Sequence, residues 1–477
     1  MKIIFSAFLL SFSVMMLAQD VKPPAAVYPV PSEAQMAWHD MEMNAFIHFT
    51  TNTFTGLEWG YGNESLSVFN PSSIDVNQWV SVLKDAGFKM VILTCKHHDG
   101  FCLWPSKYTE HSVKNSPFKD DVVKAVSEAC KKHGLKFGVY LSPWDRNHAE
   151  YGREGYLTYY RNQLKELFTN YGPVTEMWFD GANGGDGYYG GANETRRING
   201  RTYYNWPVTM GIVKEMAPDV IFFSDAGPGV RWVGNEKGIA GETNWNSITA
   251  DTLFAGKPGI EDLLGTGSPD GKNWIPAEVD VSIRPGWFYH ASEDSLVKTP
   301  EKLFEIYLTS VGRGSLMLLN VPPDKRGLFH ENDVNALKGF RAILNREFAY
   351  DLAADAVVMA SSYRGKSAKY SPAMMNDGNK DTYWATDNNI NRASIEIDLR
   401  KNANVKYVVL EEYIRLGQRI SKFNVEIMEN GKWKKVAEGT TIGHKRILKL
   451  DGSGTGKIRV NILSSKACPL VSGISIY

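Results

Sequence analysis

The sequence predicts an α/β protein in which a (β/α)8-like barrel is followed by an antiparallel β-sandwich. Strand-like and helix-like segments alternate from residue 40 to 347, which indicates a parallel sheet. Several of these strand-like segments end in polar and aromatic side chains, and the carboxyl ends of barrel strands are where active sites form. From about residue 349 long helical patterns stop and short alternating strands follow, which predicts a separate β domain.

The elements of the first part follow from hydrophobic spacing. The segment 75–87 has Val76, Trp79, Val80 and Leu83 on one helical face. The expected strands are 43–51, 88–95, 135–142, 174–180, 220–226 and 315–323. The expected helices are 75–87, 121–133, 154–171, 208–218, 302–314 and 331–348. The stretch from 227 to about 300 reads as mostly loop. An open doubly wound sheet is the competing topology, but functional-looking residues leave many different strands, which favours a barrel.

The second part contains short strands with alternating apolar residues, separated by turn signals. The Asn-Gly pair at 430–431 and the Asp-Gly pair at 451–452 are typical of hairpin turns. The expected strands are 393–400, 406–414, 422–429, 433–439, 445–450 and 457–464. We therefore divide the chain into a signal peptide at 1–18, a catalytic barrel at 19–347 and a β-sandwich at 348–477.

The first residues read as a secretory signal peptide. Lys2 is followed by an apolar run that is short for a membrane span, and Ala18 precedes a plausible cleavage site. No later segment is apolar enough to cross a bilayer. The mature protein is expected to be exported without membrane insertion, and to be periplasmic or secreted.

Composition excludes some functions and favours none strongly. The formal net charge is +0, with 53 basic and 53 acidic residues, and no basic stripe indicates nucleic acid. The 4 cysteines are too few to form a disulfide framework in 477 residues. Aromatic residues reach 12%, and Tyr and Trp suit carbohydrate faces, although a large core would also explain them.

A carboxylate follows Trp-Phe at the end of the strand 174–180. Asp180 is the best candidate for a glycosidase nucleophile, and Trp178 lies two residues earlier on the same face of the strand. Retaining glycosidases also need a second carboxyl group as acid and base. The residues alone leave three candidates for that role, Glu236, Glu242 and Glu278.

Three histidines end two of the strands and predict a polar pocket floor. His48 ends the first strand, and His97 and His98 end the second, where imidazoles can bond sugar hydroxyls. Metal binding is the rival reading, but adjacent residues on a strand point to opposite sides. Glu58 and Trp59 lie in a glycine-rich loop that can reach over the barrel mouth.

These motifs resemble glycoside hydrolase family 29, the α-L-fucosidases. The resemblance covers about 33 to 347 and rests on FIHFT, GLEWG, KHHDGFCLWPS, GVYLSPWD and MWFDGA. It implies a (β/α)8-like barrel, a retaining mechanism and Asp180 as the nucleophile. The substrate-binding residues that it implies, with the loop residues above, are His48, Glu58, Trp59, His97, His98, Tyr140, Trp178, Glu278 and Trp287.

The acid/base differs between two branches of this family. The branch that is strict for α-1,3/1,4-linked fucose has an RW-x-GNE-x-G motif, which RWVGNEKG matches, so the resemblance implies Glu236. Glu278 resembles the position that the broader branch uses and stays as the alternative.

The C-terminal region resembles a discoidin-like (F5/8 type C) module. The marks are VVMASS, NDGNKDTYWAT and VSGISIY. In such modules this loop sometimes holds calcium through oxygen ligands, and Asn376, Asp377 and Asp381 are the candidates here. A solvated turn explains them equally well, and the module can equally be a sugar binder or a spacer.

We thus expect an exported, retaining exo-α-L-fucosidase that needs no cofactor, apart from a possible structural calcium ion in the module. Its expected partner is a fucosylated oligosaccharide or glycoconjugate. The alternatives are a retaining glycosidase of another sugar, such as an α-galactoside, and a sugar-binding protein that has lost catalysis. A zinc hydrolase is the most distant alternative.

Overall fold

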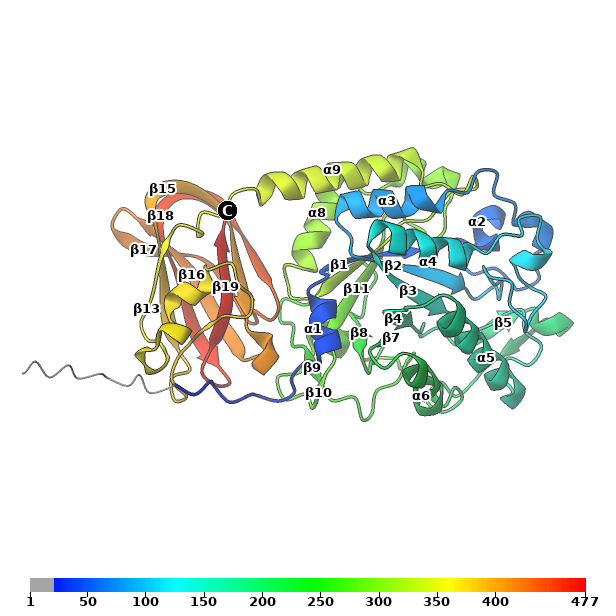
Figure 1. Ribbon diagram of the computed structural model, residues 1–477, viewed down its shortest axis with the longest axis horizontal. Helices are drawn as coiled ribbons and strands as arrows, with labels where there is room; N and C mark the ends of the chain where they lie inside the picture. The colour runs from blue at the N-terminus through cyan, green and yellow to red at the C-terminus, as the bar shows by residue number, and fades with distance from the viewer. Residues whose placement is uncertain (1–20) are drawn as a thin grey trace, which may run out of the picture.

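Residues 21–477 of the computed structural model form a closed barrel and a β domain that lie side by side (Figure 1). The predicted signal peptide lies outside the described residues. Within residues 21–477, no helix is long and apolar enough to span a membrane. All four cysteines are buried and free. The predicted fold class, a (β/α)8-like barrel followed by an antiparallel β domain, is confirmed.

The barrel consists of eight parallel strands. Their closed spatial order is β1-β12-β11-β8-β7-β4-β3-β2, so the first and last strands pair and leave no free edge. The strands are β1 (Met43–Ile47), β2 (Met90–Lys96), β3 (Lys136–Leu141), β4 (Glu176–Trp178), β7 (Ile221–Ser224), β8 (Val230–Trp232), β11 (Ala277–Ser282) and β12 (Leu316–Asn320).

Two of these strands, β8 and β11, lie in the stretch that we expected to be mostly loop, where no barrel strand was predicted. β8 is three residues long, too short for an apolar pattern to register. β11 reads AEVDVS, and its two carboxylates made it look unlike a buried strand. Both carboxylates point into the barrel, because alternate residues of a strand share a face.

The helices surround the barrel unevenly. No helix separates β7 from β8, and only a short helix follows β8. The helices are α1 (Glu33–His39), α2 (Thr51–Thr55), α3 (Val76–Ala86), α4 (Val122–His133), α5 (Glu154–Asn170), α6 (Trp206–Met216), α7 (Glu261–Thr266), α8 (Pro300–Thr309) and α9 (Glu331–Glu347). Small two-stranded ribbons pair β5 (Gly185–Gly187) with β6 (Glu194–Arg196), and β9 (Ser247–Ile248) with β10 (Asn273–Trp274).

The C-terminal domain, which we call the module (residues 348–477), is an antiparallel sandwich. Its strand order is β14-β19-β15-β18-β16-β17, with β13 also paired to β15. The strands are β13 (Val357–Ala360), β14 (Trp384–Ala385), β15 (Ala393–Glu412), β16 (Ile420–Glu429), β17 (Lys432–Gly439), β18 (Arg446–Ser465) and β19 (Leu470–Ile476). Two pairs of expected strands are in fact single long strands, β15 and β18. Register shifts interrupt the pairing of β15 with β18 near the middle of the strand. The polar residues between the two halves of β15 therefore resembled a turn in the sequence.

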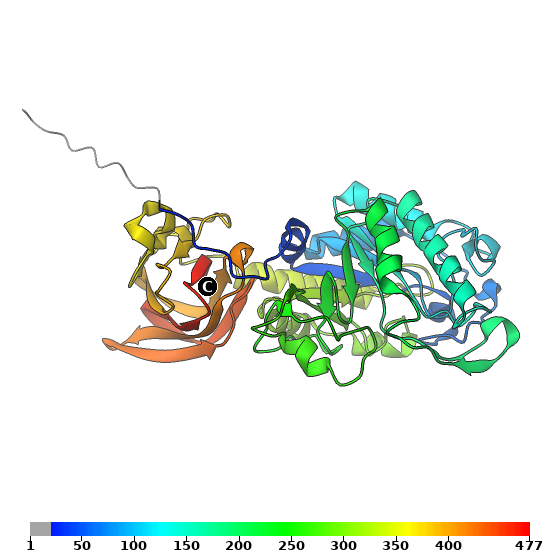
Figure 2. The same cartoon turned by 90° about the horizontal axis from the view of Figure 1, so that it is seen from below.

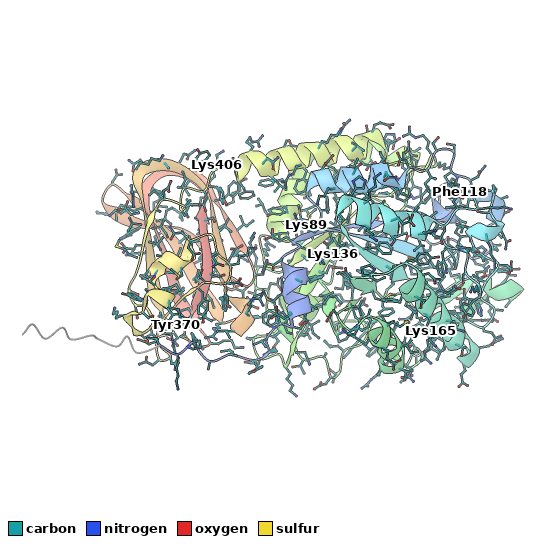
Figure 3. The ribbon with its side chains drawn as sticks, viewed as in Figure 1. Lys89, Phe118, Lys136, Lys165, Tyr370 and Lys406 are labelled. Atoms are coloured by element: carbon teal, nitrogen blue, oxygen red, sulfur yellow. The ribbon has the colours of Figure 1, made fainter. Side chains whose placement is uncertain are left out.

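The module lies at the amino ends of the barrel strands. Lys89, just before β2, and Lys136, the first residue of β3, lie toward it, whereas Phe118 is on the far side (Figure 3). Helix α9 leads into it, and residues 21–31 run back along its surface (Figures 1 and 2). This N-terminal strap is bonded to the module, since the Val27 amide donates to the Leu416 carbonyl at 2.9 Å.

The amino end of the barrel is closed by Trp38 of α1, which lies over two buried glutamates. The Trp38 indole donates to Glu176 Oε2 at 3.1 Å, and the Trp178 indole donates to Glu278 Oε1 at 2.9 Å. The other oxygens of the two carboxyls are buried without a donor among the described residues. Burial raises the pKa of both carboxyls, and the charge of Glu176 raises the pKa of Glu278 further. At least one of them therefore holds a proton at neutral pH.

This pair predicts a pH-dependent stability. A raised pKa means that the folded protein holds a proton that the unfolded chain releases, so the free energy of unfolding falls as pH rises above the usual glutamate value of 4.5. We expect the wild-type Tm to fall more between about pH 5 and about pH 8 than that of the double variant Glu176→Gln/Glu278→Gln. Thermal unfolding at both pH values measures the difference, with the exposed Glu128→Gln as the control. An equal fall in all three proteins would contradict a shared buried proton.

Candidate active site

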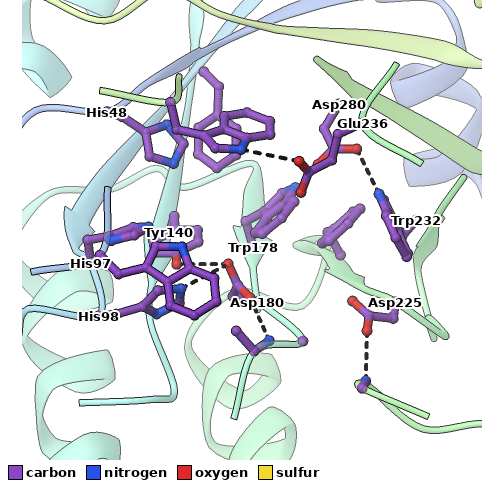
Figure 4. A pocket seen from close by; sticks show the side chains of 17 residues that line it. His48, His97, His98, Tyr140, Trp178, Asp180, Asp225, Trp232, Glu236 and Asp280 are labelled. Atoms are coloured by element: carbon purple, nitrogen blue, oxygen red, sulfur yellow. Dashed lines mark hydrogen bonds and ion pairs between the residues drawn. The ribbon is translucent and has the colours of Figure 1, made fainter. Parts of the chain in front are cut away.

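A cavity of about 260 Å³ opens at the carboxyl ends of the barrel strands, the size of one monosaccharide (Figure 4). Side chains from many different strands and their following loops line it, as the sequence predicted for a barrel. The lining residues are Phe46, His48, Trp59, His97, His98, Tyr140, Trp178, Asp180, Gly181, Ala182, Phe223, Asp225, Trp232, Glu236, Gly256, Asp280 and Trp287.

Asp180 lies at the floor of this cavity, just beyond β4, with its side chain 22% exposed. Its Oδ2 accepts from the Tyr140 hydroxyl at 3.0 Å, and its Oδ1 accepts from the Ala182 amide at 2.7 Å. Burial raises the pKa of this carboxyl, whereas the two hydrogen bonds favour the anion. A Cβ at Gly181 would lie 2.0 Å from a carboxylate oxygen of Asp225, so a side chain here would displace the Asp225 carboxylate.

His48 and His98 are neutral, and their partners fix their tautomers. Burial lowers the pKa of each to about 3. His48 Nδ1 lies 2.8 Å from Asn320 Oδ1, and the Asn320 amide nitrogen donates elsewhere, so His48 donates through Nδ1. His98 Nδ1 lies 2.7 Å from Ser142 Oγ, whose own proton goes to the Trp144 carbonyl, so His98 also donates through Nδ1. Both rings therefore offer Nε2 as an acceptor.

This tautomer decides how His98 and Asp180 interact. His98 Nε2 is 3.8 Å from Asp180 Oδ2, and neither atom carries a proton. Two acceptors at that distance are suited to bonding hydroxyl protons of a ligand rather than each other. His97 is also held neutral, since burial lowers its pKa strongly, and its Nδ1 has no partner among residues 21–477.

One wall of the cavity is aromatic. Trp178 stacks on Phe223 with ring centroids 3.9 Å apart, and Tyr140 stacks on Trp178 at 5.4 Å. Phe46 packs against Trp178 at 5.1 Å, and Trp287 is 6.4 Å from Phe46. This wall gives an apolar surface for the unsubstituted or deoxygenated side of a sugar.

Glu236 lies at the mouth of the same cavity and is partly exposed to solvent. Its Oε2 accepts from the Trp287 indole at 3.4 Å, the one hydrogen bond to its carboxylate in the described chain. Burial raises the pKa of this carboxyl, and so do the negative charges of Asp180 and Glu58. Gly234 lets the loop leave β8 sharply, because its φ is +87° and a Cβ would lie 2.4 Å from the Glu261 carbonyl oxygen.

Three other glutamates named from the sequence do not line the cavity. Glu278 is fully buried below it and bonds the back edge of Trp178. Glu58 holds a loop, since its carboxylate accepts from the Trp287 amide at 2.8 Å and from His290 Nε2 at 2.6 Å. Glu242 lies where the barrel meets the module and pairs with Arg446 at 2.8 Å. The other residues predicted for the site all meet at the cavity.

Comparisons with known proteins agree with this geometry. The α-L-fucosidase family profile matches residues 25–347, and the F5/8 type C domain profile matches residues 357–472. This chain belongs to the α-L-fucosidase family, glycoside hydrolase family 29.

Related enzymes span almost the whole chain. "Alpha-L-fucosidase 1" of Arabidopsis thaliana is 39% identical over 98% of this chain and 93% of its own length. A glycoside hydrolase 29 family member from an unknown rumen bacterium is 43% identical, covers 95% of this chain and 78% of its own, and has a TM-score of 0.85. A Ruminococcus gnavus GH29 fucosidase in complex with fucose is 33% identical, covers 96% and 97%, and has a TM-score of 0.86.

Sequence reasoning missed two acidic residues in this fucosidase pocket. Asp225 follows β7 as Asp180 follows β4, and burial raises its pKa to about 6. That repeated strand-then-Asp pattern was a signal for it. Asp280 lies within β11, accepts from the Trp232 indole at 2.9 Å, and has a pKa raised by burial and by Glu236. It was missed because β11 was not recognised as a strand.

Two of the three calcium candidates of the module bond to the protein, whereas the Asp381 side chain is 80% exposed and lies 3.9 Å from Arg415. The Asn376 amide nitrogen donates to the Ala353 carbonyl at 2.8 Å. Asp377 accepts from the Asn379 amide and from the Thr382 hydroxyl. Within the part of the chain that the structure describes, no three His, Cys, Asp or Glu side chains are grouped as metal ligands. The side-chain oxygens of Asp377 thus belong to a hydrogen-bonded turn.

Proposed function

We propose that the protein is an exported, retaining exo-α-L-fucosidase that releases α-1,3/1,4-linked fucose from oligosaccharides or glycoconjugates. The observation that carries the proposal is the pair formed by Asp180 at the floor of the sugar-sized cavity and Glu236 at its mouth. A retaining glycosidase needs one carboxylate beneath the anomeric carbon and one carboxyl group beside the leaving oxygen.

In the first step Asp180 attacks the anomeric carbon and forms a glycosyl-enzyme ester. Glu236 gives its proton to the glycosidic oxygen, and the bond from that oxygen to the sugar breaks. In the second step the Glu236 carboxylate takes a proton from water, and the water oxygen attacks the same carbon. Asp180 leaves as a carboxylate and Glu236 is protonated again, so the enzyme returns to its starting state.

The surrounding groups suit these two roles. The Tyr140 hydroxyl and the Ala182 amide stabilise Asp180 as an anion. Burial and the charge of Asp180 raise the pKa of Glu236, which favours its protonated form and suits the role of the acid. The neutral histidines supply acceptors for the sugar hydroxyls, and the aromatic wall suits the C5 methyl group of fucose.

Replacing the nucleophile tests the mechanism. We expect Asp180→Ala to lower kcat by about 10³-fold or more, because the covalent step is lost. Azide should restore turnover of a reactive fucoside by attacking from the face that Asp180 vacates, and the product should be β-L-fucosyl azide. NMR of the products measures this. The neighbouring variant Asp225→Ala is the control and should yield no azide adduct. An α-configured azide product would contradict the assignment.

Linkage specificity is a separate prediction. The loop sequence RWVGNEKG supports the α-1,3/1,4-specific branch of the family. We expect release of fucose from Lewis-type trisaccharides and at least about 100-fold lower kcat/KM on 2′-fucosyllactose, a difference of about 3 kcal/mol in transition-state binding. Product analysis by chromatography measures both, with an α-galactoside in the same panel. Comparable rates on the two fucosylated sugars would contradict the branch assignment.

We further propose that hydrolysis needs no cofactor, because both chemical roles fall to carboxyl groups. A structural calcium ion in the module stays a separate proposal. We expect a chelator to leave kcat/KM unchanged, and to lower the Tm only if the turn around Asp377 binds calcium. Activity lost on chelation and restored by a divalent cation would contradict the first statement.

We expect export because of the predicted signal peptide at 1–18, and we expect the mature protein to be periplasmic or secreted. Fractionation of the producing cells would test this, and a full-length cytoplasmic protein would contradict it.

A further inference from the structure

The loop that carries Glu236 runs from the pocket mouth to the module. This acid/base loop, residues 233–246, follows β8, where a regular barrel would have a helix. Its tip is exposed, and a single hydrogen bond of 3.4 Å restrains the Glu236 carboxylate. The position of that carboxylate is therefore set by the backbone of the loop rather than by contacts of its own side chain.

The far half of this loop is bonded to the module. The Asn244 amide donates to Thr441 Oγ1 at 2.9 Å, and the Asn246 amide donates to Gln418 Oε1 at 2.8 Å. Gln418 Nε2 in turn donates to the Asn244 carbonyl at 2.9 Å. All four residues are buried, so each of these bonds lies in a site where an unpaired group would be costly.

The middle of the loop is held by two arginines. Arg446 of the module donates to the carbonyl of Glu242 at 2.9 Å and to its carboxylate at 2.8 Å. Arg313, just beyond α8, pairs with the same carboxylate and donates to the Ala240 carbonyl at 2.7 Å. The Ile447 amide of the module donates to the Gly312 carbonyl at 2.9 Å, so the module also holds the turn that bears Arg313.

These contacts are not required to keep the module attached. Helix α9 connects it covalently to the barrel, and the N-terminal strap is bonded to it at Leu416 and Arg419. Lys445 also pairs with Glu42 at 2.5 Å, and Arg415 pairs with Glu33 at 2.8 Å, and neither glutamate belongs to the loop. The side chains that grip residues 240–246 can therefore be changed without detaching the module.

We infer that the module positions the general acid/base of the barrel: Thr441, Gln418 and Arg446 fix the acid/base loop and so hold Glu236 over the leaving oxygen. This inference rests on the proposed role of Glu236. The three side chains bond the loop and do not line the cavity, so they are positioning residues. The module is then part of the catalytic unit whether or not it binds sugar.

The test compares a leaving group that needs protonation with one that does not. In the full-length double variant Gln418→Leu/Thr441→Val, we expect kcat/KM on a fucosylated oligosaccharide to fall about tenfold, a part of the usual contribution of a general acid. On α-L-fucosyl fluoride, whose leaving group needs little protonation, the change in the glycosylation step should stay within about twofold.

The pH profile gives a second readout. The neighbourhood of Asp180 helps to raise the pKa of Glu236, so a displaced loop lowers that pKa. Activity of the acid form is lost as pH rises through this pKa, so the basic limb of the oligosaccharide profile should move to lower pH in the double variant. A merely weakened fold would lower the rates on both substrates without this shift.

Two further variants make the outcomes distinct. Arg415→Ala removes a contact between the module and α1 but leaves the loop intact, so both substrates should react as in the wild type. Glu236→Gln should lose much more activity on the fucosylated oligosaccharide than on α-L-fucosyl fluoride. If Glu236→Gln shows it and the double variant does not, the positioning role is overturned and the proposed function stands. If Glu236→Gln does not show it, the acid/base assignment itself is wrong. Equal losses on both substrates in the double variant would also overturn the inference.

Discussion

Closure of the parallel barrel is the constraint on which the site depends. β1 pairs with β12 on one side and β2 on the other, so all eight strands must point the same way around one axis. Their carboxyl ends then converge on one opening, and side chains that are far apart in the sequence meet there. His48, Tyr140, Asp180 and Glu236 come to one cavity for this reason rather than through local sequence.

The side chains below that opening are buried, and this burial shifts their pKa values. Burial keeps the histidines neutral and raises the pKa of every carboxyl group near the floor for which a shift is resolved. Asp180 is the member with hydrogen-bond donors aimed at both oxygens, which favours its anion. In the proposed mechanism the two carboxyl groups take different roles, Asp180 as the nucleophile at the floor and Glu236 as the acid at the mouth.

The irregular part of the barrel is where function and domain architecture meet. Between β8 and β11 a regular barrel would have one long helix. This chain instead forms a loop, a short helix and a small two-stranded ribbon. That loop reaches the pocket at one end and the module at the other. A flexible connection at this place would leave Glu236 without support, because its own side chain has one weak partner. The buried bonds from the module supply that support.

The sequence by itself determined the fold class, the family resemblance and most of the pocket. The strand-end motifs around His97, Tyr140 and Asp180 could be read because strand periodicity and polar termini are local properties. Local properties do not report which carboxylates face the cavity. Glu58 and Glu278 turned out to hold a loop and a tryptophan rather than line the pocket, and Asp280 was hidden in a strand whose charges concealed it. Only the tertiary structure decided the positions of these three side chains. Whether a side chain is buried and whether it faces the cavity depend on residues that barrel closure and docking of the module bring together.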